Sequence, residues 1–409
     1  MTEQSTEQAA AGEPDRFSPL HDEHVALGAS LTSFGGWQMP LRYTSDLAEH
    51  RAVREAAGLF DLSHMGEIHV TGPQAAAALD HALVGNLTAV APGRARYTMI
   101  CAEDGSVLDD LVVYRLAAEQ FLVVANAGNA PLVARELVAR AEGFDAVVTD
   151  RGSETALVAV QGPRAEAIVA GLVDASGATG GQDDPVQTIP SMKYYASASV
   201  ALTVEDGTVD ALVARTGYTG EDGFELFVPA DRAAALWRTL LAAGVPHGLV
   251  PAGLSARDSL RLEAGMPLYG HELDTTTTPY EAGLGRVVKL EKADVTRSDG
   301  STVPFVGRDA LAARKVSPPA RVLVGLKGLG RRPARAGYGV VLPAAGEEPR
   351  RIGTVTSGAP SPTLGYPIAM AYVSPELAAE GTELAVDVRG RAEPVVVVPL
   401  PFYRRPQQS

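Results

Sequence analysis

The feature that most constrains the fold is an internal repeat in the first two-thirds of the chain. Residues 70–79 and 160–169 both read as a strand end, a Gly-Pro turn and an Ala-rich helix. Later in each half, a Glu-Asp-Gly turn precedes a β-branched run, at residues 103–105 and again at 205–207. The two halves therefore carry the same signals in the same order.

A third matched pair completes the repeat. Residues 121–141 and 224–243 each read as a strand led by phenylalanine, followed by a helix rich in Ala and Leu. The offset between matched segments is roughly 90 to 100 residues, far longer than the repeat of a solenoid. We therefore expect two copies of one α+β unit that pack against each other.

The pattern changes after the repeat. The polar segment that follows reads as a linker with one short helix around residues 308–314. Six short β-branched runs with turns between them then predict a small antiparallel barrel or jelly roll. Within this region, the Pro- and Gly-rich loop 358–365 is expected to be stiff and to reach toward the first two domains. The predicted divisions are a disordered tail at 1–16, a repeat region at 17–287 with copies at about 17–150 and 151–287, a linker at 288–319 and a β domain at 320–404.

Two adjacent acids, Asp109 and Asp110, lie in the middle of a predicted strand within residues 105–115. Successive strand residues face opposite sides of a sheet, so the two carboxylates cannot both reach solvent by the same route. Burying an unpaired charge costs several kcal/mol, so a buried acid is normally paired, protonated or functional. The alternative is a half-solvated strand in which one Asp meets water and the other caps a turn.

The glycine-rich stretch 215–226 has three glycines around Tyr218 and ends in a strand that carries Glu225. Such a backbone can approach a flat ligand closely, and the acid suits the donor-rich edge of a heterocycle such as a pterin. The alternative is a hairpin turn with a solvated glutamate.

The two copies differ where these acids occur. The second copy has Leu212 and Val213 where the first has Asp110, and the first has Leu122 where the second has Glu225. Each half thus places one acid where its sister keeps a hydrophobic residue. Such local exceptions to a shared pattern are typical of functional sites.

Residues 252–264 predict an amphipathic helix on which Arg257 and Arg261 share one face. One interpretation is a clamp for a carboxylate or phosphate. The other is a surface ladder of ion pairs with Asp258 and Glu263, each contributing little to stability.

Composition excludes several classes of function. The formal net charge of −14 argues against nucleic-acid binding through phosphate neutralisation. A single cysteine, Cys101, excludes an internal disulfide and a multi-cysteine metal site, and the pair His21 and His24 has no carboxylate-rich helix beside it, so no metal is expected. No apolar run is long enough for a membrane span, and the first 16 residues lack a secretory signal, so we expect a cytoplasmic protein.

From about Ser18 to Arg404, the chain resembles the T-proteins of the glycine cleavage system, which are aminomethyltransferases. The stretches that carry the resemblance include Phe-Gly-Gly-Trp-Gln-Met-Pro, Gly-Leu-Phe-Asp-Leu-Ser-His-Met-Gly-Glu, Leu-Asp-Asp-Leu-Val-Val-Tyr and Ser-Gly-Ala-Pro-Ser-Pro-Thr-Leu-Gly. These four lie at residues 34–40, 58–67, 108–114 and 357–365, and two further stretches lie at 215–226 and 253–263.

The resemblance implies an α+β fold with a three-domain cloverleaf arrangement. Two duplicated, ferredoxin-like α+β domains and a C-terminal antiparallel β-barrel or jelly-roll domain would surround a central tetrahydrofolate site. Asp110 matches the catalytic aspartate of the family. The positions that match folate-binding residues are Glu225, Arg257, Tyr218, Asn126, Tyr97 and Tyr194.

The chain departs from the family pattern at Met266, where relatives often carry a tyrosine. An aromatic contact to the pterin is therefore expected to be missing or supplied elsewhere. The basic pair Arg404 and Arg405 is expected to meet the glutamate tail of folate.

The implied reaction moves the methylene of an aminomethyl group from the lipoyl arm of H-protein to tetrahydrofolate. The products are 5,10-methylenetetrahydrofolate, ammonia and dihydrolipoyl H-protein, and no metal or redox cofactor is expected. The implied partners are lipoylated H-protein and, with it, the glycine decarboxylase and dihydrolipoyl dehydrogenase components.

Two alternatives use the same scaffold. One is a folate-dependent demethylase. The other is a non-catalytic folate-binding protein of iron–sulfur maintenance, whose Lys-Gly-Cys signature is replaced here by Arg-Thr-Gly-Tyr at residues 215–218.

Overall fold

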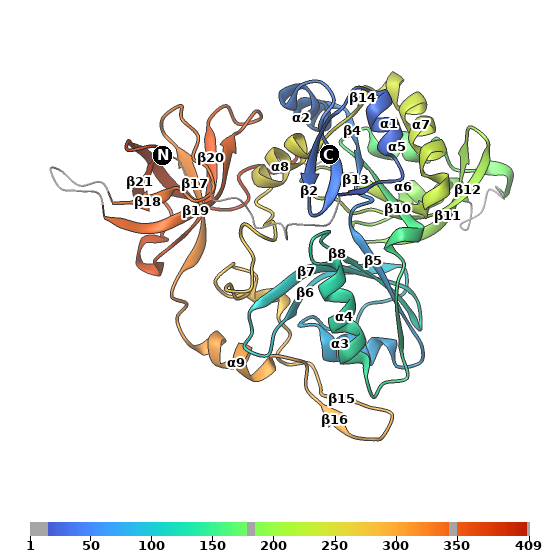
Figure 1. Cartoon of the computed structure of the whole chain (residues 1–409), viewed down its shortest axis with the longest axis horizontal. Coiled ribbons are helices and arrows are strands. Elements are labelled where there is room, and N and C mark those ends of the chain that lie inside the picture. The colour runs from blue at the N-terminus through green and yellow to red at the C-terminus, as the bar shows by residue number, and fades with distance from the viewer. Residues whose placement is uncertain (1–14, 178–184, 343–349, 407–409) are drawn as a thin grey trace.

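Three lobes surround a common centre in the computed structural model of the chain, which describes residues 15–177, 185–342 and 350–406 (Figure 1). Two lobes are α+β and contain the repeat, and the third is a closed β-barrel. This is the predicted cloverleaf. Residues 1–14 of the predicted tail lie outside the described residues, whereas Arg16 belongs to a short strand.

The first α+β lobe is built on an antiparallel sheet with strand order β6-β7-β8-β5-β9. Its strands are β5 (Gly66–Thr71), β6 (Arg94–Cys101), β7 (Val107–Ala117), β8 (Gln120–Ala125) and β9 (Val147–Asp150). Helices α3 (Ala75–Ala82) and α4 (Ala130–Ala141) bury Leu79 and Leu137 against one face of this sheet. The opposite face of the sheet is left for the second lobe.

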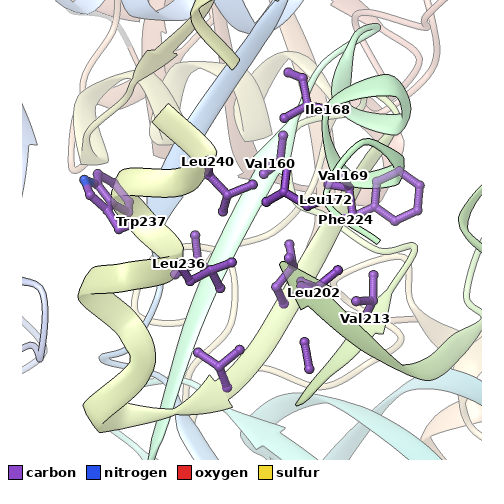
Figure 2. Packing of buried hydrophobic residues seen from close by; sticks show 14 of the residues in the cluster. Val160, Ile168, Val169, Leu172, Leu202, Val213, Phe224, Leu236, Trp237 and Leu240 are labelled. Atoms are coloured by element: carbon purple, nitrogen blue, oxygen red, sulfur yellow. The ribbon is translucent and has the colours of Figure 1, made fainter. Parts of the chain in front are cut away.

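The second lobe has strand order β11-β12-β13-β10-β4-β14, with only the β4–β14 pair parallel. Its elements are β4 (Ala57–Asp61), β10 (Thr155–Gln161), α5 (Ala165–Ala170), α6 (Pro185–Ser191), β11 (Ser197–Val204), β12 (Gly207–Ala214), β13 (Gly223–Pro229), α7 (Ala233–Gly244) and β14 (Leu249–Pro251). In Figure 2, Leu236 and Leu240 of α7 point toward the strands, whereas Trp237 lies on the other side of the helix. There Trp237 meets the ring of His24, with 5.4 Å between ring centroids.

The two sheets repeat each other strand for strand, because β6-β7-β8-β5 corresponds to β11-β12-β13-β10. The two copies also join symmetrically where strands β6 and β11 begin. The backbone N–H of Ala95 donates to the carbonyl of Tyr195 at 2.9 Å, and that of Ser197 donates to the carbonyl of Gly93 at 2.8 Å. Gly93 and Tyr195 therefore hold equivalent places, and both have a positive φ, 73° and 62°. The predicted duplication is confirmed.

Strand pairing corrects the predicted match at Asp110. Val112 of β7 and Leu212 of β12 each pair with the residue three places after the leading phenylalanine of the next strand. They are therefore equivalent, and the sister of Asp110 is Asp210, which is exposed, and not Leu212. The sequence comparison was wrong by two residues, because the first copy has extra residues between the Glu-Asp-Gly turn and the acid. In addition, the pairing of β6 with β7 shifts register at a bulge.

The predicted match between Leu122 and Glu225 holds in the folded chain. Leu122 pairs with Tyr114, and Glu225 pairs with Ala214, at equivalent points of the two sheets. Both lie on the faces that the two sheets turn toward each other. One lobe thus presents an apolar residue and the other an acid at this shared face.

The N-terminal segment joins the second lobe and not the first. Strands β1 (Arg16–Phe17), β2 (Ser30–Phe34) and β3 (Trp37–Arg42) form a small sheet, and helices α1 (His21–Ala26) and α2 (Asp46–Glu55) follow β1 and β3. Strand β4 pairs with β10 of the second sheet, and all five of its residues are buried. A strand buried on both faces needs an interior place in a sheet, which β10 and β14 provide. The range 17–150 is therefore not a single structural unit.

The segment between the repeat and the barrel includes β15 (Val295–Thr296), β16 (Thr302–Val303) and the predicted short helix, α9 (Arg308–Val316). It is packed and is not a free linker. Phe305 and Leu311 are buried with Met99 and Val107 of the first lobe. The segment therefore fixes the distance between that lobe and the barrel.

All six predicted strands of the C-terminal domain are present and close into an antiparallel barrel, ordered β17-β20-β19-β18-β21-β22. Its strands are β17 (Val322–Gly328), β18 (Gly339–Val341), β19 (Arg351–Pro360), β20 (Pro367–Val373), β21 (Glu383–Asp387) and β22 (Ala392–Val398). Closure leaves no unpaired sheet edge. The stiff loop after β19 reaches the α+β lobes as predicted, because Ser361 and Thr363 bond to Glu263.

Helix α8 (Leu254–Glu263) connects all three lobes. The fully buried carboxylate of Glu263 accepts hydrogen bonds from Arg54 Nη2 of α2 at 2.8 Å and from Thr363 Oγ1 of the barrel loop at 2.7 Å. Two residues earlier, buried Arg261 donates to Glu272 at 2.8 Å and to Ser357 of the barrel at 2.7 Å. Arg261 also pairs with Asp258 at 2.7 Å, as the predicted ladder had it, but Arg261 and Glu263 are buried, so this is not a surface ladder.

Replacing Glu263→Gln is expected to lower the free energy of unfolding at pH 7 by about 3 kcal/mol, because it leaves buried donors and Arg54 without their anion. Burial alone would raise the pKa of Glu263, but hydrogen bonds from His50 and Ser361 and the charge of Arg54 lower it to about 2. Since the folded-state pKa lies below the ordinary 4.5, this stabilisation is present above about pH 4.5 and is lost as the pH falls toward 2.

Urea titrations of both proteins across this pH range measure the effect. The matched control is Glu154→Gln, which removes an ion pair with Arg151 whose glutamate side chain is 59% exposed and should cost less than about 1 kcal/mol. Equal losses in the two variants would contradict the role given to Glu263.

Candidate active site

A cavity of about 270 Å³ lies between the two sheets and helix α8. Its walls come from β7, β8, the loop after β12, β13, α8 and the segment after α8. Of the seven site residues predicted from the sequence, all but Tyr194 line it. The polar and aromatic lining residues are Tyr97, Asp110, Tyr114, Asn126, Tyr195, Thr216, Tyr218, Glu225 and Arg257.

Asp110 points into this cavity from the centre of β7. Tyr97 Oη donates to its Oδ2 at 3.0 Å, and Asn126 Nδ2 donates to its Oδ1 at 2.9 Å. Burial raises the pKa of Asp110 above its ordinary value, whereas the hydrogen bonds from Tyr97 and Asn126 and the charge of Arg257 act in the opposite direction. The carboxyl group therefore has a raised pKa and lines the cavity, where a ligand can reach it.

Asp109 faces the other side of the sheet, as alternation along a strand requires, and is fully buried. It accepts hydrogen bonds from Asn126 Nδ2 at 2.8 Å, from the Asn126 backbone N–H at 3.0 Å and from Asn129 Nδ2 at 2.8 Å. Burial and the neighbouring charge of Asp110 raise the pKa of Asp109 to about 7. The predicted alternative, with one Asp in water and the other capping a turn, does not occur.

Glu225 enters the cavity from β13, on the side opposite Asp110. Tyr114 Oη donates to its Oε2 at 3.0 Å, and Thr216 Oγ1 donates to the same oxygen. Burial raises the pKa of Glu225, and the hydrogen bonds from Thr216 and Tyr114 limit that rise. The carboxylate is thus fixed in place by both lobes, and one oxygen remains for a ligand.

Sequence reasoning missed Tyr114 and Thr216. A signal for Tyr114 existed, because it lies four residues after Asp110 in the same strand and therefore faces the same side. No local signal pointed to Thr216, because its role depends on the other lobe bringing Tyr114 to it at 3.0 Å.

Arg257 extends from α8 into the cavity and lies over the ring of Tyr218, 4.6 Å from its centroid. Tyr218 is held in turn, because its hydroxyl donates to the carbonyl of Pro267. Burial lowers the pKa of Arg257, and its buried Nε has no hydrogen-bond partner among the described residues. The guanidinium is therefore available to a ligand, whereas Arg261 of the predicted clamp is occupied by Glu272.

The structure places Tyr195, and not the predicted Tyr194, on the cavity wall. The two rings are in contact edge to face at 4.9 Å, but the Tyr194 residue is 46% exposed. Sequence reasoning could not separate the adjacent tyrosines, because the choice follows from the positive φ of Tyr195.

Met266 also lines the cavity, together with Met65. The position where relatives often have tyrosine is thus filled by a flexible apolar side chain, and Tyr97, Tyr114 and Tyr195 supply aromatic surface elsewhere. At the C-terminus, Arg405 Nη1 lies 3.3 Å from Asp222 Oδ1, so this arginine is partly neutralised, and Arg404 is exposed.

A second groove of about 380 Å³ adjoins the cavity and shares Gly265, Pro267 and Leu284 with it. Its other wall is formed by the barrel strands β17 and β22 and the segment after β22. The cavity is thus continuous with a passage between the barrel and the α+β lobes.

The described part of the chain holds no group of three or more His, Cys, Asp or Glu side chains placed to bind a metal ion. His24, noted in the sequence for its spacing from His21, instead bonds to Asp61 at 2.8 Å and to Tyr43 at 2.9 Å. Among the described residues, no helix is both long and apolar enough to span a membrane.

Comparison with known proteins extends the resemblance seen in the sequence. The profile of the GCVT N-terminal domain matches residues 20–292, and that of the glycine cleavage T-protein C-terminal barrel domain matches residues 321–404. The chain belongs to the glycine cleavage T-protein family. The first profile covers both α+β lobes as one domain, which agrees with the contribution of β4 to the second sheet.

Relatives of this T-protein family match over nearly the whole chain. An aminomethyltransferase of Streptomyces coelicolor is 58% identical over 394 residues, which span 95% of this chain and 98% of the relative. One from Symbiobacterium thermophilum is 46% identical and covers 96% and 98%. The crystal structure of the glycine cleavage system aminomethyltransferase T from Bartonella henselae superposes with a TM-score of 0.82 at 37% identity, covering 95% and 98%. Neither alternative function on this scaffold is favoured by these matches.

The pair Tyr194 and Tyr195 gives a direct test of the cavity. Tyr195→Ala is expected to weaken tetrahydrofolate binding about tenfold or more, because it removes an aromatic wall that contributes about 1–3 kcal/mol to stacking. Tyr194→Ala should change the dissociation constant less than twofold, because its ring lies outside the cavity. Fluorescence titration measures both constants, and a larger loss in Tyr194→Ala would show that the cavity wall is misassigned.

Proposed function

We propose that this chain is the aminomethyltransferase of a glycine cleavage system. It transfers the methylene of the aminomethyl group on lipoyl H-protein to tetrahydrofolate, giving 5,10-methylenetetrahydrofolate, ammonia and dihydrolipoyl H-protein. The observation that carries this proposal is Asp110, a carboxyl group held by Tyr97 and Asn126 on the wall of a cavity shared by both lobes. The relatives that match along the whole chain are named aminomethyltransferases.

Tetrahydrofolate suits this cavity as the second substrate. A reduced pterin is flat and presents several N–H donors along its edge, and the cavity offers the carboxylates of Asp110 and Glu225 as acceptors. Four tyrosines give it aromatic walls, and its volume of about 270 Å³ suits a bicyclic head group better than the whole molecule. We expect the remainder of the substrate to extend out of the cavity.

Asp110 acts on the reacting centre in this proposal. Ammonia leaves as the one-carbon unit moves, so positive charge develops on the carbon, and an ionised carboxylate beside it stabilises that charge. The same group can accept a proton from a substrate amine and pass it on, because its raised pKa brings it closer to neutral pH. The cavity otherwise contributes by positioning, holding the two substrates at reacting distance.

Glu225 and Arg257 hold the substrate and take no part in the bond changes. Glu225 is fixed by Tyr114 and Thr216 and accepts from the N–H edge of the pterin. Arg257 addresses an anionic part of the substrate with its free guanidinium edge. Asn126, Tyr97 and Tyr218 complete the binding surface, and Tyr195 takes the place first given to Tyr194.

The partners follow from the reaction. Lipoylated H-protein must reach the cavity with its arm, and the glycine decarboxylase and dihydrolipoyl dehydrogenase components load and reoxidise that arm. No metal is proposed for this step. Arg404 and Arg405, at the end of the described chain, remain candidates for the glutamate tail of folate.

Asp110→Asn tests the catalytic assignment. It is expected to lower turnover at least a hundredfold while tetrahydrofolate affinity changes less than about threefold, because the amide keeps the shape but loses the charge. The assay contains the purified chain, aminomethyl-loaded H-protein and tetrahydrofolate, and follows ammonia and methylenetetrahydrofolate together. Asp210→Asn, the exposed equivalent in the sister strand, should leave turnover unchanged. Full turnover in Asp110→Asn would remove this residue from the chemistry.

The pH dependence of turnover gives a second test. Because burial raises the pKa of Asp110, the acidic limb of the kcat profile should lie above the ordinary value of 3.8, with activity rising as the pH increases through that limb. The limb should be absent from the residual activity of Asp110→Asn. A limb that persists in this variant would assign it to another group.

A further inference from the structure

The amide of Asn126 is held in a single orientation by two carboxylates. Its Nδ2 donates to Asp109 Oδ1 at 2.8 Å, to Asp110 Oδ1 at 2.9 Å and to the Asp110 carbonyl at 3.1 Å. Both amide protons are thus directed at the pair of acids. The Oδ1 of Asn126 accepts no hydrogen bond within the described chain, and the residue lines the cavity.

Asp109 fixes this arrangement from behind the sheet. It also binds the Asn126 backbone N–H at 3.0 Å and Asn129 Nδ2 at 2.8 Å, so it ties strand β7 to the connection between β8 and α4. This connection is closely packed, because Gly35 of the β2–β3 hairpin lies against Ala127. The turn that carries Asn126 therefore has little freedom to move.

A buried carboxylate at this position is not needed to build the strand. The sister of Asp109 in β12 is Val209, which is buried in the helix-facing core of the second lobe. The two sheets are equivalent, so an apolar residue satisfies the fold here. Among the described residues, the carboxylate of Asp109 accepts hydrogen bonds only from Asn126 and Asn129. The fold does not require an acid here, so we look for its role in function.

We propose that Asp109 is a positioning residue for the reaction: through Asn126 it holds a donor on Asp110 and turns the amide oxygen of Asn126 toward the N–H groups of the bound substrate. This rests on the proposed function. Asp109 itself touches no substrate. Its effect passes through the Asn126 side chain.

The charged and titratable groups around this pair set the expected direction of a pH effect. Asp109 faces Asp110 and Tyr269, and Asp110 in turn faces Tyr97, Arg257 and Tyr218. Burial and the charge of Asp110 raise the pKa of Asp109 to about 7, so Asp110 ionises first and Asp109 becomes charged only near neutral pH. Turnover should therefore show a second inflection near pH 7 that belongs to Asp109, above the acidic limb of Asp110.

The test combines Asp109→Asn with Asn126→Ala. Asp109→Asn alone should lower kcat about tenfold and remove the inflection near pH 7, because a fixed donor is loosened and the group that titrates there is lost. In the Asn126→Ala background, the same substitution should lower kcat less than twofold further, because its main route of action is already gone. A full tenfold further loss, or unchanged kcat in the single variant, would overturn the proposal.

Asn129→Ala provides an independent variant should Asp109→Asn fold poorly. The hydrogen bond from Asn129 lowers the pKa of Asp109, so without it the inflection near pH 7 should move to higher pH, although every residue at the cavity is intact. No shift would count against the proposal. Tetrahydrofolate binding, measured across the same pH range, does not depend on turnover. If the wild-type chain shows no turnover, the proposed function is overturned. The binding data for the variants then decide the role of Asp109.

Discussion

The contact between the second lobe and the barrel depends on one buried carboxylate, that of Glu263. It accepts hydrogen bonds from Arg54 in the second lobe and from Ser361 and Thr363 in the barrel loop. A charge removed from water is stable only when such partners surround it, so the ends of these segments must meet at one point. Helix α8 ends there, and the position of Arg257, two turns earlier, is set as a consequence.

In the cavity, burial and hydrogen bonding have opposite effects on the pKa values of the two acids. Asp110 and Glu225 are both pushed toward their neutral forms by burial and drawn back by neutral donors, two each. Those donors come from tyrosine, asparagine and threonine, and Arg257 acts on both acids only at a distance. Two acids with no direct ion pair retain the capacity to respond to a substrate, which a paired acid would have lost.

Local patterns in the sequence were sufficient for the duplicated lobes and all six barrel strands, because turn signals and alternation act over short distances. They also pointed to Asp110, Tyr218, Glu225 and Arg257, whereas Tyr97 and Asn126 came only from the resemblance to the T-protein family. Local patterns failed where the outcome depends on distant parts of the chain. Nothing near β4 shows that it pairs with β10, and nothing near Thr216 shows that Tyr114 will meet it. The choice between Tyr194 and Tyr195 likewise depended on a backbone angle set by contact between the two lobes.

The two-residue offset between the copies also bears on how the duplicated gene diverged. Side chains along a strand alternate, so an even number of extra residues before Asp110 leaves it on the face toward the other lobe. An odd number without a compensating bulge would have exchanged the places of Asp109 and Asp110. The bulge between β6 and β7 takes up one extra residue, so the first copy has a longer connection and Asp110 still holds the same place in its sheet as its solvent-exposed sister, Asp210.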